Sequence, residues 1–164
     1  MRRQCLERWR PRTGNHLIRP AELWEPETAL WTSHLHILCG NADDHARNHA
    51  AFWDRKNLQL TPAYDICPQS GAGEEAGQGM RIRGTVNSSQ FALCLQVAPQ
   101  YLLSEEEAKA IILQQVNTIR THWEAVCDEG APTPVDRAYL WGRQFLNPFA
   151  FYDAPDDVRV AGQL

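Results

Sequence analysis

Two short stretches of the chain hold the residues whose types and spacing best suit chemistry. The first reads Asn-Ala-Asp-Asp-His-Ala-Arg-Asn over residues 41–48, and the second reads Pro62-Ala63-Tyr64-Asp65. A loop carboxylate can orient a hydroxyl nucleophile and accept its proton, so Asp43 is a candidate general base. Carboxamide and carboxylate oxygens are hard ligands that suit magnesium, so Asn48 and Asp65 are candidate metal ligands. Together these residues favour phosphoryl transfer.

A cationic side chain lies in the same stretch. Arg47 would neutralise the charge that builds up on a transferred phosphoryl group. Taken singly, each of these polar residues also fits an ordinary turn or helix cap. Their spacing, with two short strands between the loops and an apolar helix before the first, makes a shared site the better interpretation.

The elements that must position the two stretches are a helix and a small hairpin. A helix is expected from Pro26, a residue suited to a first helical turn, to Gly40, a residue suited to termination. Strands are expected over 50–53 and 58–60, with a turn over 54–57 between them. Flanking prolines place Asp65 in an extended or turn segment.

The remainder of the chain reads as mostly helical. Ser104 and Glu107 form a capping-box pattern before a helix over 105–128, where apolar residues recur at helical spacing. A last helix is expected from Pro134 through Phe145, stopping at Asn147-Pro148. Residues 149–164 read as a flexible tail, and the glycine-containing stretch 69–79 reads as a flexible loop. The predicted fold class is mainly α with a small β-hairpin.

Composition limits the classes of protein that remain. The 164 residues are 43% hydrophobic, enough for one domain with a core. The net charge of −4 argues against nucleic acid as the main partner, although six arginines fall within the first nineteen residues. No apolar run is long enough to span a membrane, and no export signal follows the arginines. The five scattered cysteines fit reduced, buried thiols in a cytoplasmic protein.

The two stretches resemble the signature of HipA-type serine/threonine kinases, the toxins of bacterial type II toxin–antitoxin modules. The family pattern is Asn-Gly-Asp-x-His-x-Lys-Asn followed by Pro-x-Tyr-Asp-(Leu/Ile). This chain has residues 41–48 and 62–66 in the matching places. Arg47 stands where lysine is usual, and Ala42 stands where glycine is common. The likeness is dense over residues 30–66 and weaker over 80–89.

The resemblance implies a fold like the C-terminal lobe of a protein kinase over residues 25–148, after a basic arm or remnant at 1–24. It implies Asp43 as the catalytic base, and His45 and Arg47 as supports of the catalytic loop. Asn48 and Asp65 would hold the magnesium that accompanies ATP. The implied partners are a protein substrate, which in the family includes an aminoacyl-tRNA synthetase, and a HipB-like antitoxin, through which alone nucleic acid would be reached.

Other parts of a kinase ATP site have no counterpart before residue 41. No glycine-rich phosphate loop and no strand lysine is found there, and nothing resembles a helix glutamate that would pair with such a lysine. We therefore expect the C-terminal lobe only, as a truncated product or as half of a kinase whose N-terminal lobe is encoded separately. One alternative is an inactive kinase-derived binding module. Another is a metal-dependent hydrolase whose ligands are His45, His49, Asp43 and Asp44.

Overall fold

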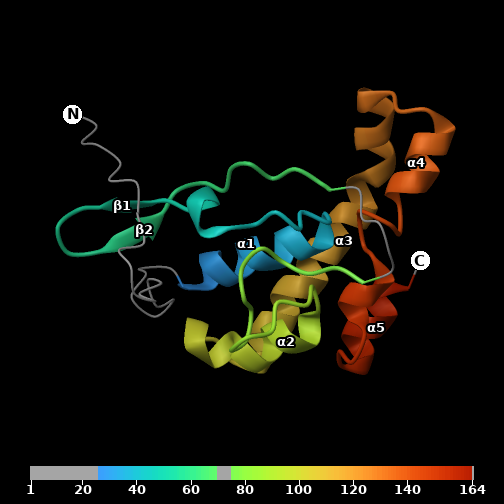
Figure 1. The fold of residues 1–164 in the computed structure, drawn as a ribbon. Helices are drawn as coiled ribbons and strands as arrows, with labels where there is room; N and C mark the ends of the chain where they lie inside the picture. The colour runs from blue at the N-terminus through green and yellow to red at the C-terminus, as the bar shows by residue number, and fades with distance from the viewer. Residues whose placement is uncertain (1–25, 70–74, 164) are drawn as a thin grey trace.

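Helices dominate the computed structural model, which describes residues 26–69 and 75–163 (Figure 1). The helices are α1 (Pro26–Leu38), α2 (Phe91–Val97), α3 (Glu105–Gly130), α4 (Pro134–Leu140) and α5 (Asp156–Gly162). Strands β1 (Ala51–Trp53) and β2 (Leu58–Leu60) pair antiparallel, with Phe52 opposite Gln59. The expected mainly helical class with a small hairpin is confirmed. The arm expected over 1–24, and residues 70–74 of the expected loop, lie outside the described residues.

The first helix ends where the sequence predicts, because Gly40 adopts a left-handed conformation with φ +67°. The amide of Asn41 donates to the carbonyl of His36, and the amide of Gly40 donates to Ile37. This pair of hydrogen bonds is a Schellman motif, which satisfies the free carbonyls at a helix end. A Cβ at Gly40 would lie 2.6 Å from the carbonyl oxygen of Gln144, so a close approach also requires glycine here.

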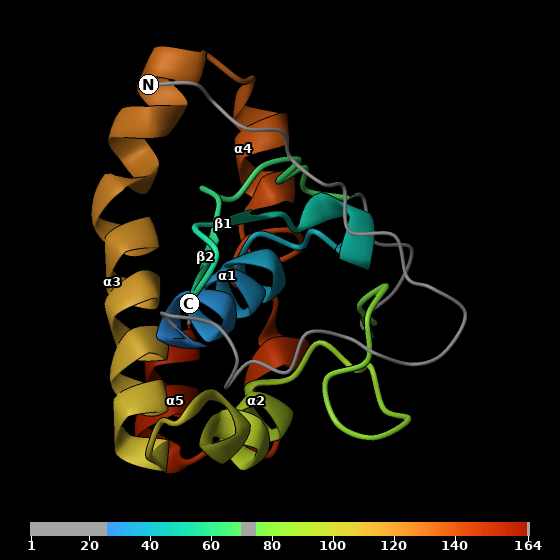
Figure 2. The same ribbon diagram turned by 90° about the vertical axis from the view of Figure 1, so that its left-hand side faces the viewer.

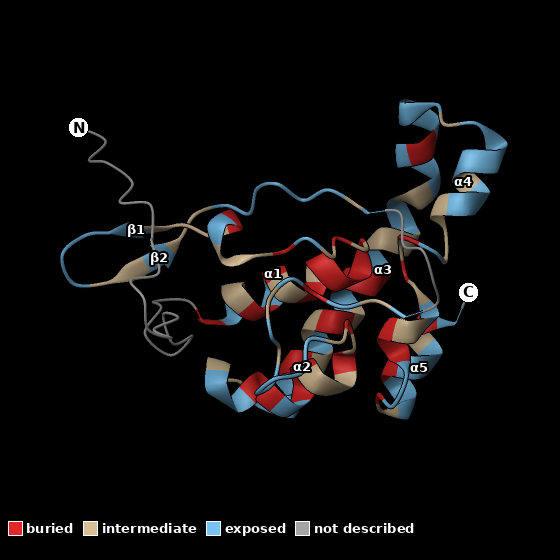
Figure 3. Ribbon diagram, viewed as in Figure 1, coloured by how far each residue is buried: buried red, intermediate tan, exposed pale blue. Residues whose placement is uncertain are grey.

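The helices α1, α2 and α5 pack on the long helix α3 (Figure 2). Ser104 caps it as predicted, since its hydroxyl accepts from the Glu107 amide while the Glu107 carboxylate accepts from Ser104. Its buried face meets α1, α2 and α5, and the core side chains include Leu30, Leu38, Phe91, Ile112 and Val158. Buried residues gather between these helices, whereas the hairpin and α4 are largely exposed (Figure 3).

The expectation of a flexible tail over 149–164 is wrong for its described residues. Pro148–Phe151 forms a 3-10 turn and α5 follows it, with Phe151 and Val158 buried in the core. Lys109 of α3 pairs with Asp157 at 3.1 Å, which ties α5 to α3. Two buried apolar side chains therefore outweigh the acidic, proline-containing composition that suggested a tail.

The last predicted helix is shorter than expected. The helix α4 begins at Pro134 as predicted but ends at Leu140, and Trp141 is already extended. Gly142 and Leu146 adopt positive φ angles of 76° and 56°, which turn the chain instead of continuing the helix. The short helix α2 was not predicted, because a single seven-residue apolar segment has too little periodicity to identify.

None of the helices in the described part of the chain is long and apolar enough to cross a membrane.

Candidate phosphoryl-transfer site

The loop over residues 41–48 starts at the end of α1 and runs to β1. Its first residue, Asn41, is 1% exposed, and its last, Asn48, closes the 3-10 turn Ala46–Asn48. The segment at Gly79 lies against this loop, because the Gly79 amide donates to the Ala42 carbonyl at 2.9 Å. A Cβ at Gly79 would lie 2.7 Å from the Asp44 carbonyl oxygen, so only glycine fits without movement. The segment at Gly79 therefore packs closely against the backbone of this loop.

The residues predicted as base and metal ligand differ in exposure. Asp43 is exposed, and within the described residues its carboxylate has no hydrogen bond or ion pair. Asn48 is 8% exposed, and its Nδ2 donates to the Asp43 backbone carbonyl at 3.3 Å. That contact uses the nitrogen of the carboxamide and leaves Oδ1 available as a ligand. Asp43 and Asn48 thus lie near the two ends of one loop, and the hydrogen bond between them brings those ends together.

Asp65 lies on the second stretch in a left-handed conformation with φ +58°. Its backbone carbonyl accepts a hydrogen bond of 3.2 Å from Nδ2 of Asn41, and the Tyr64 hydroxyl donates to the Arg47 carbonyl at 2.9 Å. The two stretches, separated by the hairpin in sequence, therefore lie side by side. Asp65 is exposed, and among the described residues its carboxylate pairs with nothing.

The two remaining predicted residues have fewer contacts. Arg47 is exposed, and it contacts the second stretch through its backbone carbonyl, not through its guanidinium. His45 precedes the 3-10 turn, its carbonyl accepts from the Asn48 amide at 2.8 Å, and its buried Nδ1 has no partner among the described residues. The roles assigned to these two side chains stay predictions.

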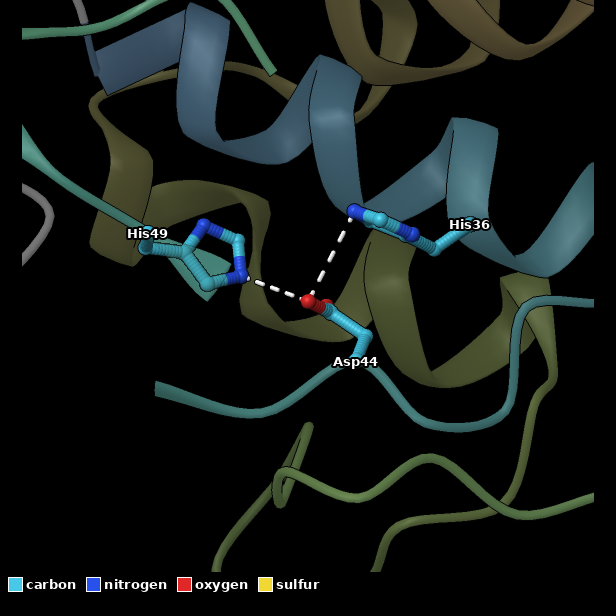
Figure 4. A group of neighbouring side chains, drawn as sticks. All are labelled: His36, Asp44 and His49. Carbon is cyan, nitrogen blue, oxygen red and sulfur yellow. Dashed lines mark hydrogen bonds and ion pairs between the residues drawn. The ribbon is translucent and has the colours of Figure 1, made fainter. Parts of the chain in front are cut away.

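A cluster of two histidines and one carboxylate lies between the loop and α1 (Figure 4). His36 from α1 and His49 from the start of the hairpin face Asp44 from different sides. Oδ1 of Asp44 lies 2.6 Å from Nε2 of His49 and 3.5 Å from Nε2 of His36. Burial lowers the pKa of His36, while Asp44 opposes that shift and His49 reinforces it. Burial therefore favours the neutral form of His36.

This cluster bears on the hydrolase alternative. Asp44 and His49 do meet, but their partner is His36, and neither His45 nor Asp43 joins them. His45 and His49 do not share a helix face, because His49 is extended, with φ −118° and ψ 133°. The expected group of four residues does not assemble.

Sequence reasoning missed the residues that join the parts of the site. Asn41 and Tyr64 belong to the two motifs, but the motifs assign them no chemical role, and His36 lies outside both motifs. The spacing offered one signal: a polar residue directly after a helix-ending glycine sits where the chain turns back toward the helix. The partners of these residues lie up to 24 positions away and depend on the fold.

Comparison with known proteins places the chain in a family. The sequence pattern of the HipA-like C-terminal domain matches residues 19–123, which is more than half of the chain and includes both stretches. No curated protein and no solved structure matches. The chain therefore belongs to the HipA-like family, of which it carries the C-terminal part.

Proposed function

We propose that this chain is the C-terminal catalytic lobe of a HipA-type serine/threonine kinase, which transfers the γ-phosphoryl group of ATP to a protein hydroxyl with magnesium. Family membership supports the class of activity. The observation that carries the proposal is the contact between the two stretches: Asn41 donates to the Asp65 carbonyl, and Tyr64 donates to the Arg47 carbonyl. A shared site for Asp43, Asn48 and Asp65 requires that arrangement.

In this proposal Asp43 accepts the proton of the attacking hydroxyl. Its exposed carboxylate, without a partner among the described residues, is accessible to a protein substrate. Arg47, also exposed, supplies positive charge next to the transferred group, and its planar guanidinium suits phosphate oxygens. Because positioning and charge are the main contributions of a protein to phosphoryl transfer, these two side chains carry most of the chemistry in this lobe.

The residues present fit magnesium. Asn48 turns its nitrogen to the Asp43 carbonyl, so Oδ1 is available, and the Asp65 carboxylate has no competing cation among the described residues. One neutral and one charged oxygen ligand, completed by phosphate and water, suit this hard cation. When bound, the ion neutralises phosphate charge. The left-handed backbone at Asp65 is a strained conformation that the Asn41 hydrogen bond supports.

A complete ATP site needs groups that clamp the nucleotide from the other side, and we propose that a kinase N-terminal lobe supplies them. Family resemblance further suggests a HipB-like antitoxin as partner, within a toxin–antitoxin system of the cytoplasm. The exposed hairpin aromatics Phe52 and Trp53, at 54% and 68%, favour a second candidate: a non-catalytic module that binds another protein.

Binding of ATP with magnesium separates the two candidates. It is measured by calorimetry on the full chain, alone and with any polypeptide encoded directly upstream. We expect Asp65→Asn to weaken magnesium-dependent binding at least tenfold, since it removes the charged ligand. Asp153→Asn is the matched control, because Asp153 is also exposed and has φ +59°. Absence of binding in both settings would favour the non-catalytic module.

A further inference from the structure

The carboxamide of Asn41 has an orientation that the structure determines. Its Nδ2 lies 3.2 Å from the backbone oxygen of Asp65 and 2.8 Å from Nδ1 of His36. A carbonyl oxygen only accepts hydrogen bonds, so the carboxamide must turn its nitrogen toward Asp65. The second hydrogen of that nitrogen then points at His36. Asn41 is thus a double donor at the junction of α1 and the two loops.

This orientation assigns the proton of His36. Because Nδ1 accepts from Asn41, the proton of the neutral imidazole is on Nε2, the atom that faces Oδ1 of Asp44 at 3.5 Å. The same carboxylate oxygen receives Nε2 of His49 at 2.6 Å. A connected series of polar contacts therefore runs from the Asp65 backbone through Asn41, His36 and Asp44 to His49. Its carboxylate, Asp44, is the immediate neighbour of Asp43.

We propose that Asn41 is a positioning residue that couples the loop over residues 41–48 to the stretch over residues 62–65. The same carboxamide holds His36 as the tautomer with its proton on Nε2, which faces Asp44. The coupling to catalysis rests on the proposed kinase function. The tautomer and the hydrogen bonds do not, because they follow from the contacts alone.

His36, Asp44 and His49 could hold a metal ion by their spacing, since their ligand atoms lie within 4.8 Å of one another. The tautomer argues against that use. A metal on Nε2 of His36 would require the proton to move to Nδ1, where it would face the NH₂ group of Asn41. Rotating the carboxamide to accept that proton would set its oxygen against the Asp65 carbonyl. The separation of 2.6 Å between His49 and Asp44 is likewise that of a hydrogen bond between them.

Nuclear magnetic resonance of the imidazole nitrogens tests the proposal on the full wild-type chain. We expect neutral His36 with the proton on Nε2 at pH 7, and no bound metal by elemental analysis. The Asn41→Leu variant removes both hydrogen bonds that Nδ2 of Asn41 donates. His36 should then lose its preference for that tautomer, and the chemical shift of the Asp65 carbonyl carbon should change. Asn87→Leu is the control, because it removes another loop carboxamide that donates to a backbone carbonyl, that of Gln78 at 2.7 Å.

The wild-type measurement alone decides the tautomer if Asn41→Leu does not fold. A proton on Nδ1 of His36, or one equivalent of zinc held by the imidazole nitrogens, would overturn the proposal. So would an Asn41→Leu variant whose His36 and Asp65 signals match those of the wild type.

A measurement of phosphoryl transfer distinguishes this proposal from the proposed kinase function. If transfer is detected, we expect Asn41→Leu to lower kcat by about tenfold to a hundredfold, as misplacement of catalytic groups does, while Asn87→Leu leaves kcat unchanged. An unchanged kcat in a folded Asn41→Leu variant would refute the positioning role. If no transfer is detected in any setting while the tautomer result holds, the proposed function fails and the hydrogen-bond assignment stands.

Discussion

The hydroxyl of Tyr64 donates a hydrogen bond of 2.9 Å to the backbone carbonyl of Arg47. The two residues are seventeen positions apart, on either side of the hairpin. This bond and the one from Asn41 to Asp65 are two side-chain contacts that join the loop over residues 41–48 to the stretch over residues 62–65. The geometry of the candidate site therefore depends on residues that are not themselves predicted to react.

Removing the Tyr64 hydroxyl should lower the local stability of the stretch over residues 62–65. We expect Tyr64→Phe to cost about 0.5–1.5 kcal/mol of local stability, the net value of one hydrogen bond. Amide hydrogen exchange at residues 64–66 should accelerate by about three- to tenfold. Tyr152→Phe is the control, because the Tyr152 hydroxyl has no partner among the described residues. Equal exchange in Tyr64→Phe and the wild type would show that the bond does not restrain the loop.

Acid should destabilise the protein through His34. This side chain is fully buried against Phe91, both ring nitrogens lack partners among the described residues, and burial lowers its pKa to about 3. The unfolded chain binds the proton near pH 6.5 and the folded chain does not. Stability is therefore lost as pH falls from 6.5 toward 3, by about 1.4 kcal/mol per unit from this group.

The His34→Leu variant separates this contribution from others. At pH 7 we expect it to be neutral or stabilising, because it replaces unpaired buried nitrogens by an apolar group. Its unfolding free energy, measured in urea between pH 4 and pH 7, should fall less steeply than that of the wild type. His122→Gln, at an exposed position of α3, should keep the wild-type slope. A wild-type slope in His34→Leu would contradict the assignment.

The packing of α5 gives a sharp test at Gly162. A Cβ there would lie 2.3 Å from Cγ of the buried Phe151, so Gly162→Ala must displace the ring or the helix. We expect a loss of about 1–3 kcal/mol, the usual cost of overpacking. Gly130→Ala is the matched control, since its Cβ would meet only Pro132 at 3.8 Å. Equal thermal stability of the two variants would mean that α5 does not pack as described.

Two helix caps of the same kind should differ in consequence. Ser104 caps α3, which carries the core, whereas Thr133 caps α4, which has no buried residue. Ser104→Ala should lower the global free energy of unfolding by about 1 kcal/mol. Thr133→Ala should mainly accelerate hydrogen exchange within α4, with little change in the global transition. An equal global loss in both variants would show that α4 is integral to the core.

Local signals explain which elements could be predicted from the sequence. The end of α1 and the start of α3 follow from Gly40 and from the Ser104–Glu107 pair, which act within one helical turn. The early end of α4 and the burial of α5 depend on contacts made by Leu146 and Val158 with distant helices. Such tertiary contacts decide the structure against the local composition, and they cannot be predicted from a short segment of sequence.

The candidate site could also be predicted only in part. The motifs identify Asp43, Asn48 and Asp65 as candidates, because phosphoryl transfer requires those residue types at that spacing. The contacts that hold these residues in place could not be predicted from the motifs. Asn41 reaches Asp65 only once the hairpin has folded back, and His36 reaches Asp44 only because the Schellman turn reverses the chain after α1.

Asp43 is the proposed base of a phosphoryl-transfer site. The most direct measurement is the rate of transfer from γ-labelled ATP with magnesium to a protein hydroxyl, by the full chain alone and with any polypeptide encoded directly upstream. We predict that Asp43→Asn lowers kcat by about 10²–10⁴-fold, whereas Asp153→Asn leaves it unchanged. Transfer by Asp43→Asn at the wild-type rate would show that Asp43 is not the base, and no transfer by the wild type in either setting would refute the proposed activity.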